Sequence, residues 1–288
     1  MAGRIPAPNH NMAVLLSLLA AVAYGGSDFA AGLGSRRIGA SAVAAGVQLL
    51  SLMTVAIALS LFSGAGPTWA PIGWGALSGV GNALGTLTLY RGFAIGRMSV
   101  VATLSAVVTA LAPVLVGVAL GDRLSGLAVA GIVIAIPSIA LVSWQKQEAG
   151  DTGRAGAVEG ALSGVGFALL FIALDQAGTG SGAWPLVIGQ ATAFLLLIPL
   201  ALKKTAVVKA WRSAALPVLL GGLLGGVSNL LFLAATGVGQ LAVVAVLTSL
   251  YPAATILLAR IFLNERWTRV QAVGLCCAAV AVALISSR

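Results

Sequence analysis

The chain alternates long apolar runs with short polar or glycine-rich connections. Ten of the runs are long enough to cross a hydrocarbon core about 30 Å thick, because a helix of about 20 residues spans that distance. The expected helices are 12–33, 40–62, 72–93, 98–120, 124–144, 156–174, 184–202, 215–235, 241–263 and 267–286. The pattern therefore predicts an all-α membrane protein with ten transmembrane helices.

Three connections stand out by their composition. A Gly/Pro/Trp loop covers 63–71, a basic loop covers 203–212, and a strongly polar linker covers 145–155. The linker falls at the middle of the chain. We therefore expect two five-helix units, residues 1–144 and 156–288, joined by this linker.

The two units are related by an internal repeat. Residues 100–141 align with 243–284 at an offset of 143, and the identical positions include Val100, Val101, Ala102, Leu104, Leu115, Leu120, Arg123, Gly131, Ala135 and Leu141. Earlier helices follow at nearly the same offset, since Tyr24 aligns with Phe167 and Gln48 with Gln190. An odd number of helices per unit makes the second copy enter the membrane from the opposite side. The sequence thus predicts two inverted repeats around a site near the membrane midplane.

Composition supports a membrane protein and excludes several classes of function. Hydrophobic residues make up 59% of the chain and charged residues 8%, far from the values of soluble domains. The net charge of +9 is spread over loops, which does not indicate a nucleic-acid partner. The single histidine, His10, lies in the N-terminal tail, so we expect no His-centred catalytic or metal site, no enzyme activity and no cofactor. Cys276 and Cys277 are adjacent in an apolar run and are interpreted as packing residues.

The basic residues indicate an orientation. Only Arg4, Arg123 and Arg288 lie on the side of the termini, whereas the connections on the other side hold thirteen: Arg36, Arg37, Arg91, Arg97, Lys146, Arg154, Lys203, Lys204, Lys209, Arg212, Arg260, Arg266 and Arg269. Basic loops stay on the cytoplasmic side of a membrane. Both termini should therefore lie outside, in the periplasm for a bacterial inner-membrane protein.

A sparse set of polar and aromatic residues lies near the middle of the expected helices. Polar groups in hydrocarbon are costly unless they are paired, so these side chains should face the interior of the bundle. They are candidates for binding a substrate: Tyr24, Gln48, Asn82, Thr86, Tyr90, Ser105, Phe167, Phe171, Gln190, Asn229, Thr248 and Tyr251. The alternative is that they bridge helices to one another, as polar residues commonly do in membranes.

Asp28 is the one acidic residue well inside an apolar run. A carboxylate within a membrane is by default a functional group, here one for proton coupling or for binding a substrate ammonium. It also lies eight residues before Arg36, about 12 Å along a helix, so it could sit near the interface and pair with Arg36 or Arg37. Both interpretations stay open.

Two prolines interrupt expected helices. Pro113 lies in 98–120 and Pro252 in 241–263, and each removes a donor from the helical hydrogen-bond ladder. Such breaks suit hinges or binding-site backbone, although a fixed kink would look the same in the sequence.

Several of these residues make the chain similar to a known family. The segment from Pro252 to Leu284 carries the pattern P-x-x-x-x-L-x-x-x-x-x-L-x-E-R followed by Gly274, and a weaker copy ends at Leu120-Gly121-Asp122-Arg123. With the Tyr24-Gly25 pair, these residues resemble the ten-helix, EamA-type branch of the drug/metabolite transporter superfamily, and within it most nearly the YddG-type amino acid exporters. The first copy departs from the pattern, with Thr109 at the position of Pro252 and Asp122 at that of Glu265. Unequal hinges in the two halves are therefore expected.

The resemblance implies a basket of helices around a central cavity, with 124–144 and 267–286 at the periphery. It implies a secondary transporter that works by alternating access. We expect export of amino acids with broad specificity and weak affinity, aromatic and apolar ones being favoured because Tyr24, Phe167, Phe171 and Tyr251 can pack against their side chains. The partners are then a small-molecule substrate and the lipid bilayer, with no nucleic acid, and an internally duplicated chain can work as a monomer. The alternative is a proton-coupled exporter of lipophilic cationic drugs or other small metabolites, which needs Asp28.

Overall fold

The structure, a computed structural model, describes residues 10–61, 66, 68–95, 98–142, 156–178, 180–203, 207–263 and 268–286, and all regular structure in these ranges is helical. The elements are α1 (His10–Ile38), α2 (Ala40–Ala58), the 3₁₀ turn η1 (Leu59–Leu61), α3 (Trp69–Ile95), α4 (Met98–Ala119), α5 (Gly126–Val142), α6 (Ala157–Ala177), α7 (Trp184–Leu202), α8 (Val207–Ser213), α9 (Ala215–Thr236), α10 (Leu241–Thr248), α11 (Tyr251–Leu263) and α12 (Arg269–Ser286). Helices cover most of the described residues in each of the ten expected ranges, which confirms an all-α membrane fold. The predicted linker 145–155 lies outside the described residues, as do 63–65 and 67 of the predicted loop 63–71, whose last three residues belong instead to α3.

Length and composition identify membrane-crossing helices within this set. Among the described residues, α1, α2, α6, α7 and α9 are long and apolar enough to span a bilayer, and shorter apolar helices lie within α4, α5, α10–α11 and α12. Large apolar side chains such as Leu15, Leu19 and Val22 point outward from α1 and are exposed. An outer surface of this kind is suited to lipid.

The expected helix 241–263 is wrong as a single helix, because it is divided into α10 and α11. Pro252 explains the division: it has no N–H, and its ring clashes with the carbonyl four residues earlier, which belongs to Thr248. α10 ends at that residue, and Pro252 becomes the second residue of α11. Proline is well tolerated there, because the first turn of a helix has no internal acceptor for its N–H groups.

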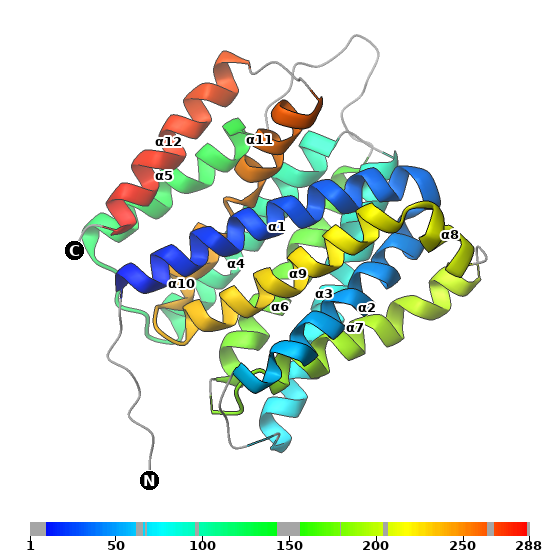
Figure 1. Cartoon of the computed structure of the whole chain (residues 1–288). Helices are drawn as coiled ribbons and strands as arrows, with labels where there is room; N and C mark the ends of the chain where they lie inside the picture. The colour runs from blue at the N-terminus through cyan, green and yellow to red at the C-terminus, as the bar shows by residue number, and fades with distance from the viewer. Residues whose placement is uncertain are drawn as a thin grey trace.

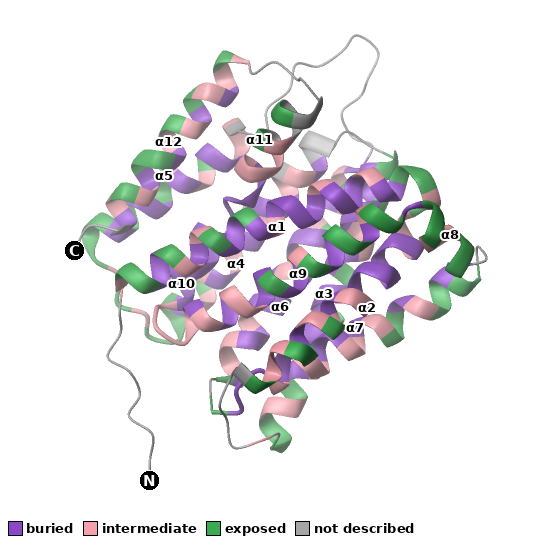
Figure 2. Ribbon diagram, viewed as in Figure 1, coloured by how far each residue is buried: buried purple, intermediate pink, exposed green. Residues whose placement is uncertain are grey.

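Other boundaries also differ from expectation. The basic segment 203–212 is not only a loop, since it contains the short helix α8, in which the Trp211 ring nitrogen donates a hydrogen bond to the Ala42 carbonyl of α2 at 2.7 Å. α1 continues five residues beyond its predicted end and stops at Gly39, whose φ of 85° favours glycine. Figure 2 shows α8 largely exposed beside the buried residues of α1 and α2.

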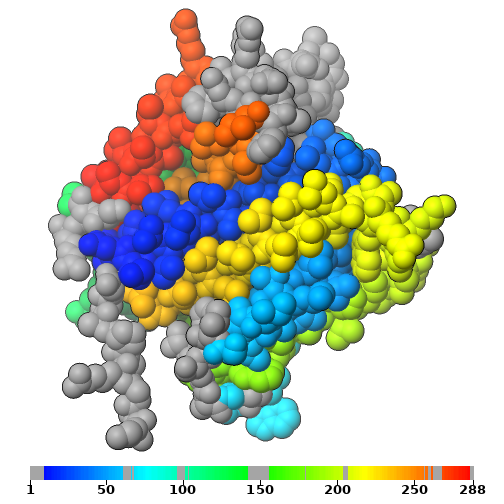
Figure 3. Space-filling model, viewed as in Figure 1, coloured from blue at the N-terminus to red at the C-terminus, as the bar shows by residue number. Residues whose placement is uncertain are grey.

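The helices form a bundle with one separate pair at its edge. α5 and α12 pack against each other there (Figure 1), and a methyl group on Gly131 would lie 2.6 Å from the Ile285 side chain. On the face shown in Figure 3, α1, α9 and α2 lie side by side. α3 packs on α6 and α7, while α4 packs on α6.

Glycine sets the distance between α3 and α6. A methyl group on Gly81 would lie 2.6 Å from the Gly166 carbonyl oxygen and 2.7 Å from the Leu170 nitrogen, and one on Gly85 would lie 2.6 Å from the Phe167 ring. Backbone therefore meets backbone, an approach that small residues allow between membrane helices.

This close contact predicts a specific cost for any side chain at Gly81. Gly81→Val should lower the stability of the purified protein by about 1–3 kcal/mol or prevent its folding, because the clash is with backbone atoms that cannot yield. Gly73→Val is the matched control, since Gly73 is in the same helix and has open space where its side chain would be. Thermal unfolding followed by circular dichroism measures both, and equal melting temperatures for the two variants would contradict this account.

Candidate functional site

Four buried residues from three helices form one hydrogen-bonded cluster. Gln48 of α2 donates from its amide nitrogen to Asn82 Oδ1 at 3.0 Å and to Thr86 Oγ1 at 3.2 Å, both on α3. Asn82 donates in turn to Gln48 Oε1 at 3.3 Å and to Gln190 Oε1 of α7 at 3.2 Å. The Thr86 hydroxyl donates to Asn82 Oδ1 at 3.1 Å. We call Gln48, Asn82, Thr86 and Gln190 the amide cluster.

The amide cluster bridges α2, α3 and α7 in this conformation. Bridging helices and binding a substrate are not exclusive roles for these residues. Asn82 uses both its donor and its acceptor capacity within the cluster. Gln190 is only an acceptor here: in the described part of the chain its amide nitrogen forms no hydrogen bond. A buried amide nitrogen with spare donors can receive an anionic or carbonyl oxygen.

A second polar contact joins α1 to α9. The Tyr24 hydroxyl donates to Asn229 Oδ1 at 2.8 Å, and the Asn229 amide nitrogen donates to the Gly225 carbonyl at 2.7 Å. Asn229 is therefore oriented by its own helix to receive Tyr24.

A third contact joins α4, α6 and α11. Ser105 and Ser163 lie 2.9 Å apart through their hydroxyl oxygens, and the Tyr251 hydroxyl lies 3.5 Å from the same Ser105 oxygen. These residues hold the beginning of α11 against α4.

Aromatic rings lie close to these polar groups. Phe171 of α6 stacks on Phe232 of α9 with ring centroids 4.1 Å apart, and the Tyr24 ring lies 6.0 Å from Phe171 at a tilt of 52°. Phe167 is half-buried and packs against Gly85. One face of Phe171 is thus covered by Phe232. Among the four rings predicted to contact a substrate, Tyr24 and Phe167 are half-buried, whereas Phe171 and Tyr251 are buried.

Asp28 lies deep in the structure, on the same face of α1 as Tyr24. Its side chain is buried, with the residue 8% exposed, whereas Arg36 and Arg37 are exposed at the end of the helix. In the described residues no ion pair joins Asp28 to either arginine. Its carboxylate is close enough to Tyr24, Tyr90 and Tyr251 to interact electrostatically with their hydroxyls. These are the three tyrosines of the chain.

The α10–α11 break brings two more polar residues into this region. Thr248 and Ser249 are fully buried, and their hydroxyl oxygens have no hydrogen-bond partner within the described chain. Pro113, by contrast, lies inside α4, which continues through it to Ala119. The two prolines predicted as hinges therefore differ: one interrupts a helix and the other does not.

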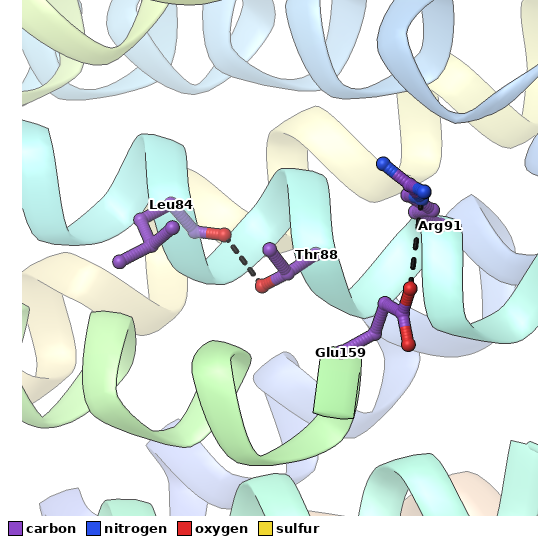
Figure 4. A network of polar contacts seen from close by, with 4 residues as sticks. All are labelled: Leu84, Thr88, Arg91 and Glu159. Atoms are coloured by element: carbon purple, nitrogen blue, oxygen red, sulfur yellow. Dashed lines mark hydrogen bonds and ion pairs between the residues drawn. The ribbon is translucent and has the colours of Figure 1, made fainter. Parts of the chain in front are cut away.

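Other polar contacts and a surface cavity lie apart from these residues. Figure 4 shows the Arg91 to Glu159 ion pair at 3.6 Å, between the end of α3 and the start of α6, and the Thr88 hydroxyl on its own helix's Leu84 carbonyl at 2.6 Å. A cavity of about 400 Å³ opens between α2, α8 and α9, with Leu50, Trp211 and Leu219 in its lining. None of the predicted site residues lines it.

Two residues of the site were missed by the sequence reasoning. Ser163 and Phe232 both contact predicted residues. A helical spacing could have found Ser163, because it precedes Phe167 and Phe171 by one and two turns. Nothing in the composition of α9 separates Phe232 from an ordinary packing residue.

Comparison with known proteins supplies two matches. Residues 154–287 match the model of the EamA-like transporter family. Eighteen chains of solved structures match; one crystal structure is 18% identical, with a TM-score of 0.74 over 96% of both chains, a likeness that shows the fold. No curated protein matches the sequence.

The amide cluster predicts different outcomes for two threonines of α3. Thr86→Val should lower stability by about 1 kcal/mol, because the buried Gln48 amide nitrogen loses one of its two acceptors and the buried Asn82 Oδ1 loses one of its two donors. Thr88→Val is the matched control and should change stability by less than about 0.5 kcal/mol, because its hydroxyl lies at the surface. Chemical unfolding in detergent measures both; a larger loss for Thr88→Val would argue against the cluster.

Proposed function

Because residues 154–287 form an EamA-like transporter domain in a multi-pass membrane fold, we propose that the whole chain is a secondary transporter made of two inverted repeats. The repeats would be residues 1–144 and 156–288, with the linker 145–155 between them. The pairing of helices supports this. If α1 corresponds to α6, α2 to α7 and α3 to α9, then the α3–α6 contact has its counterpart in α1–α9, and α3–α7 has its counterpart in α2–α9.

Individual contacts follow the same correspondence. Gly79 of α3 packs against Gly189 and Thr192 of α7, and Gly222 of α9, 143 positions after Gly79, packs against Val47 and Leu50 of α2. The partners also correspond, because 189 and 192 are each 142 positions after 47 and 50. The two α10–α11 and α4 segments differ at Pro252 and Thr109, so the halves are similar without being equivalent.

The transported substrate is proposed to be an amino acid, with aromatic and apolar ones favoured and export as the direction. The observation that carries this substrate proposal is the amide cluster, which is buried and uncharged and lies close to aromatic rings. It lies between helices whose outer faces are apolar. Gln190 has spare donors for a substrate carboxylate, and the half-buried Tyr24 and Phe167 offer ring surface for its side chain. Recognition by neutral groups favours broad specificity and weak affinity.

Proton-coupled export of lipophilic cations is the second candidate function. The burial of Asp28 without an arginine or lysine partner in the described residues favours it, because such a carboxylate can bind either a proton or a cation.

Transport by purified protein in liposomes separates the two functions. We expect uptake of labelled phenylalanine that exceeds that of empty liposomes and does not respond to a pH gradient. Movement of a lipophilic cation that requires the gradient and is abolished by Asp28→Asn would instead establish the second candidate.

The proposed location is a bacterial inner membrane, with the protein working as a monomer and both termini in the periplasm. The excess of basic residues in the opposite loops supports this orientation. Alkaline phosphatase fused to the C-terminus should then be active in cells, while a fluorescent protein fused there should stay dark. The reverse result would place the C-terminus in the cytoplasm.

A further inference from the structure

The break between α10 and α11 leaves several oxygen atoms without donors. The described backbone hydrogen bonds at the break use the carbonyls of Ala245, Leu247 and Leu250. The Thr248 carbonyl loses its ordinary helical donor, because the residue four positions later is Pro252. The Thr248 and Ser249 hydroxyls, both fully buried, have no partner in the described structure.

Unpaired buried hydroxyls of this kind are costly unless something binds them. A buried polar group that forms no hydrogen bond lowers the stability of the protein more than an apolar group of the same shape would. The membrane interior supplies no general source of water to bind such a group. Thr248 and Ser249 therefore mark a place where the free protein gives up stability, which is typical of binding sites.

The electrostatics of the break favour a cation. The C-terminal end of a helix carries a partial negative charge, and α10 ends at Thr248 in the interior of the protein. Hydroxyl and carbonyl oxygens add acceptors. Interrupted membrane helices bind cations through such groups.

Asp28 supplies a full negative charge on α1, the helix that packs against the start of α11. α1 and α11 meet at Gly25, where the Thr255 hydroxyl donates to the Gly25 carbonyl at 3.1 Å. The Asp28 carboxylate interacts electrostatically with Tyr251, the first residue of α11 and three residues after Thr248.

We infer that the α10–α11 break is the binding site for the ammonium group of the transported amino acid, through Thr248, Ser249 and Asp28. This inference rests on the proposed function for the identity of the ligand. It divides the recognition of the substrate between two regions, the break for the ammonium and Gln190 of the amide cluster for the carboxylate. It also gives Asp28 a role that requires no proton transfer.

Three probes that share a phenyl ring test the site by direct binding to the purified full chain. Phenylalanine has both charged groups, phenethylamine has only the ammonium, and 3-phenylpropionate has only the carboxylate. Thr248→Val and Ser249→Ala remove the hydroxyls, and Thr88→Val is the control on an exposed helix face.

The expected result is a loss that depends on the ammonium. Thr248→Val should weaken binding of phenylalanine and phenethylamine roughly tenfold or more, the loss expected for a hydrogen bond to a charged group, while 3-phenylpropionate binds as before. Its melting temperature should be equal to or higher than that of the unmodified protein, because valine has the same shape and no unpaired hydroxyl. A purely structural threonine would not give this combination.

Other outcomes overturn the inference and are distinct from failure of the transport proposal. Equal losses of binding for all three probes, or no loss for any, would show that the break does not bind the ammonium. If phenylalanine binding needs sodium chloride rather than potassium chloride, and Thr248→Val abolishes that need, the occupant is a sodium ion instead. If phenethylamine binding depends on Thr248 but phenylalanine is not transported, the cation site stands and amino acid export fails.

Discussion

The structure depends on one constraint: every polar group within an apolar bundle has to find a partner inside the protein. Gln48, Asn82, Thr86 and Gln190 meet it by bonding to one another across three helices, and Asn229 meets it through Tyr24 and its own backbone. These bonds fix which faces of the helices point inward. The Thr248 and Ser249 hydroxyls have no such partner in the described chain, and we assign to them the binding of the substrate ammonium.

Small residues make this arrangement possible. Gly81 and Gly166 let α3 and α6 approach at backbone distance, which brings the polar faces of α3 and its neighbours together. A transporter needs interfaces that are well packed and still able to slide, and smooth glycine faces provide both. The edge pair of α5 and α12 takes no part in the polar contacts described above (Figure 1).

Much of the fold could be predicted from the sequence, because each membrane-crossing helix corresponds to a long apolar run. The division of 241–263 was not predicted, although Pro252 was recognised as a break, because a proline can kink a helix, end it or begin a new one. The amide residues were identified because amides are rare and costly in apolar runs. Their pairing was not, because which inward-facing groups meet depends on helix rotation. Asp28 shows the same limit: the sequence placed it equally well beside Arg36 or in the interior, and only the packing of α1 buries it.

We propose that this chain carries amino acids across a membrane by exposing one internal site to each side in turn. Counterflow measures this most directly: liposomes containing the purified protein are loaded with unlabelled phenylalanine and then given a trace of labelled phenylalanine outside. Our account predicts a transient accumulation of label above its equilibrium level, which unloaded liposomes do not show. Equal uptake by loaded and unloaded liposomes, or none in either, would contradict it.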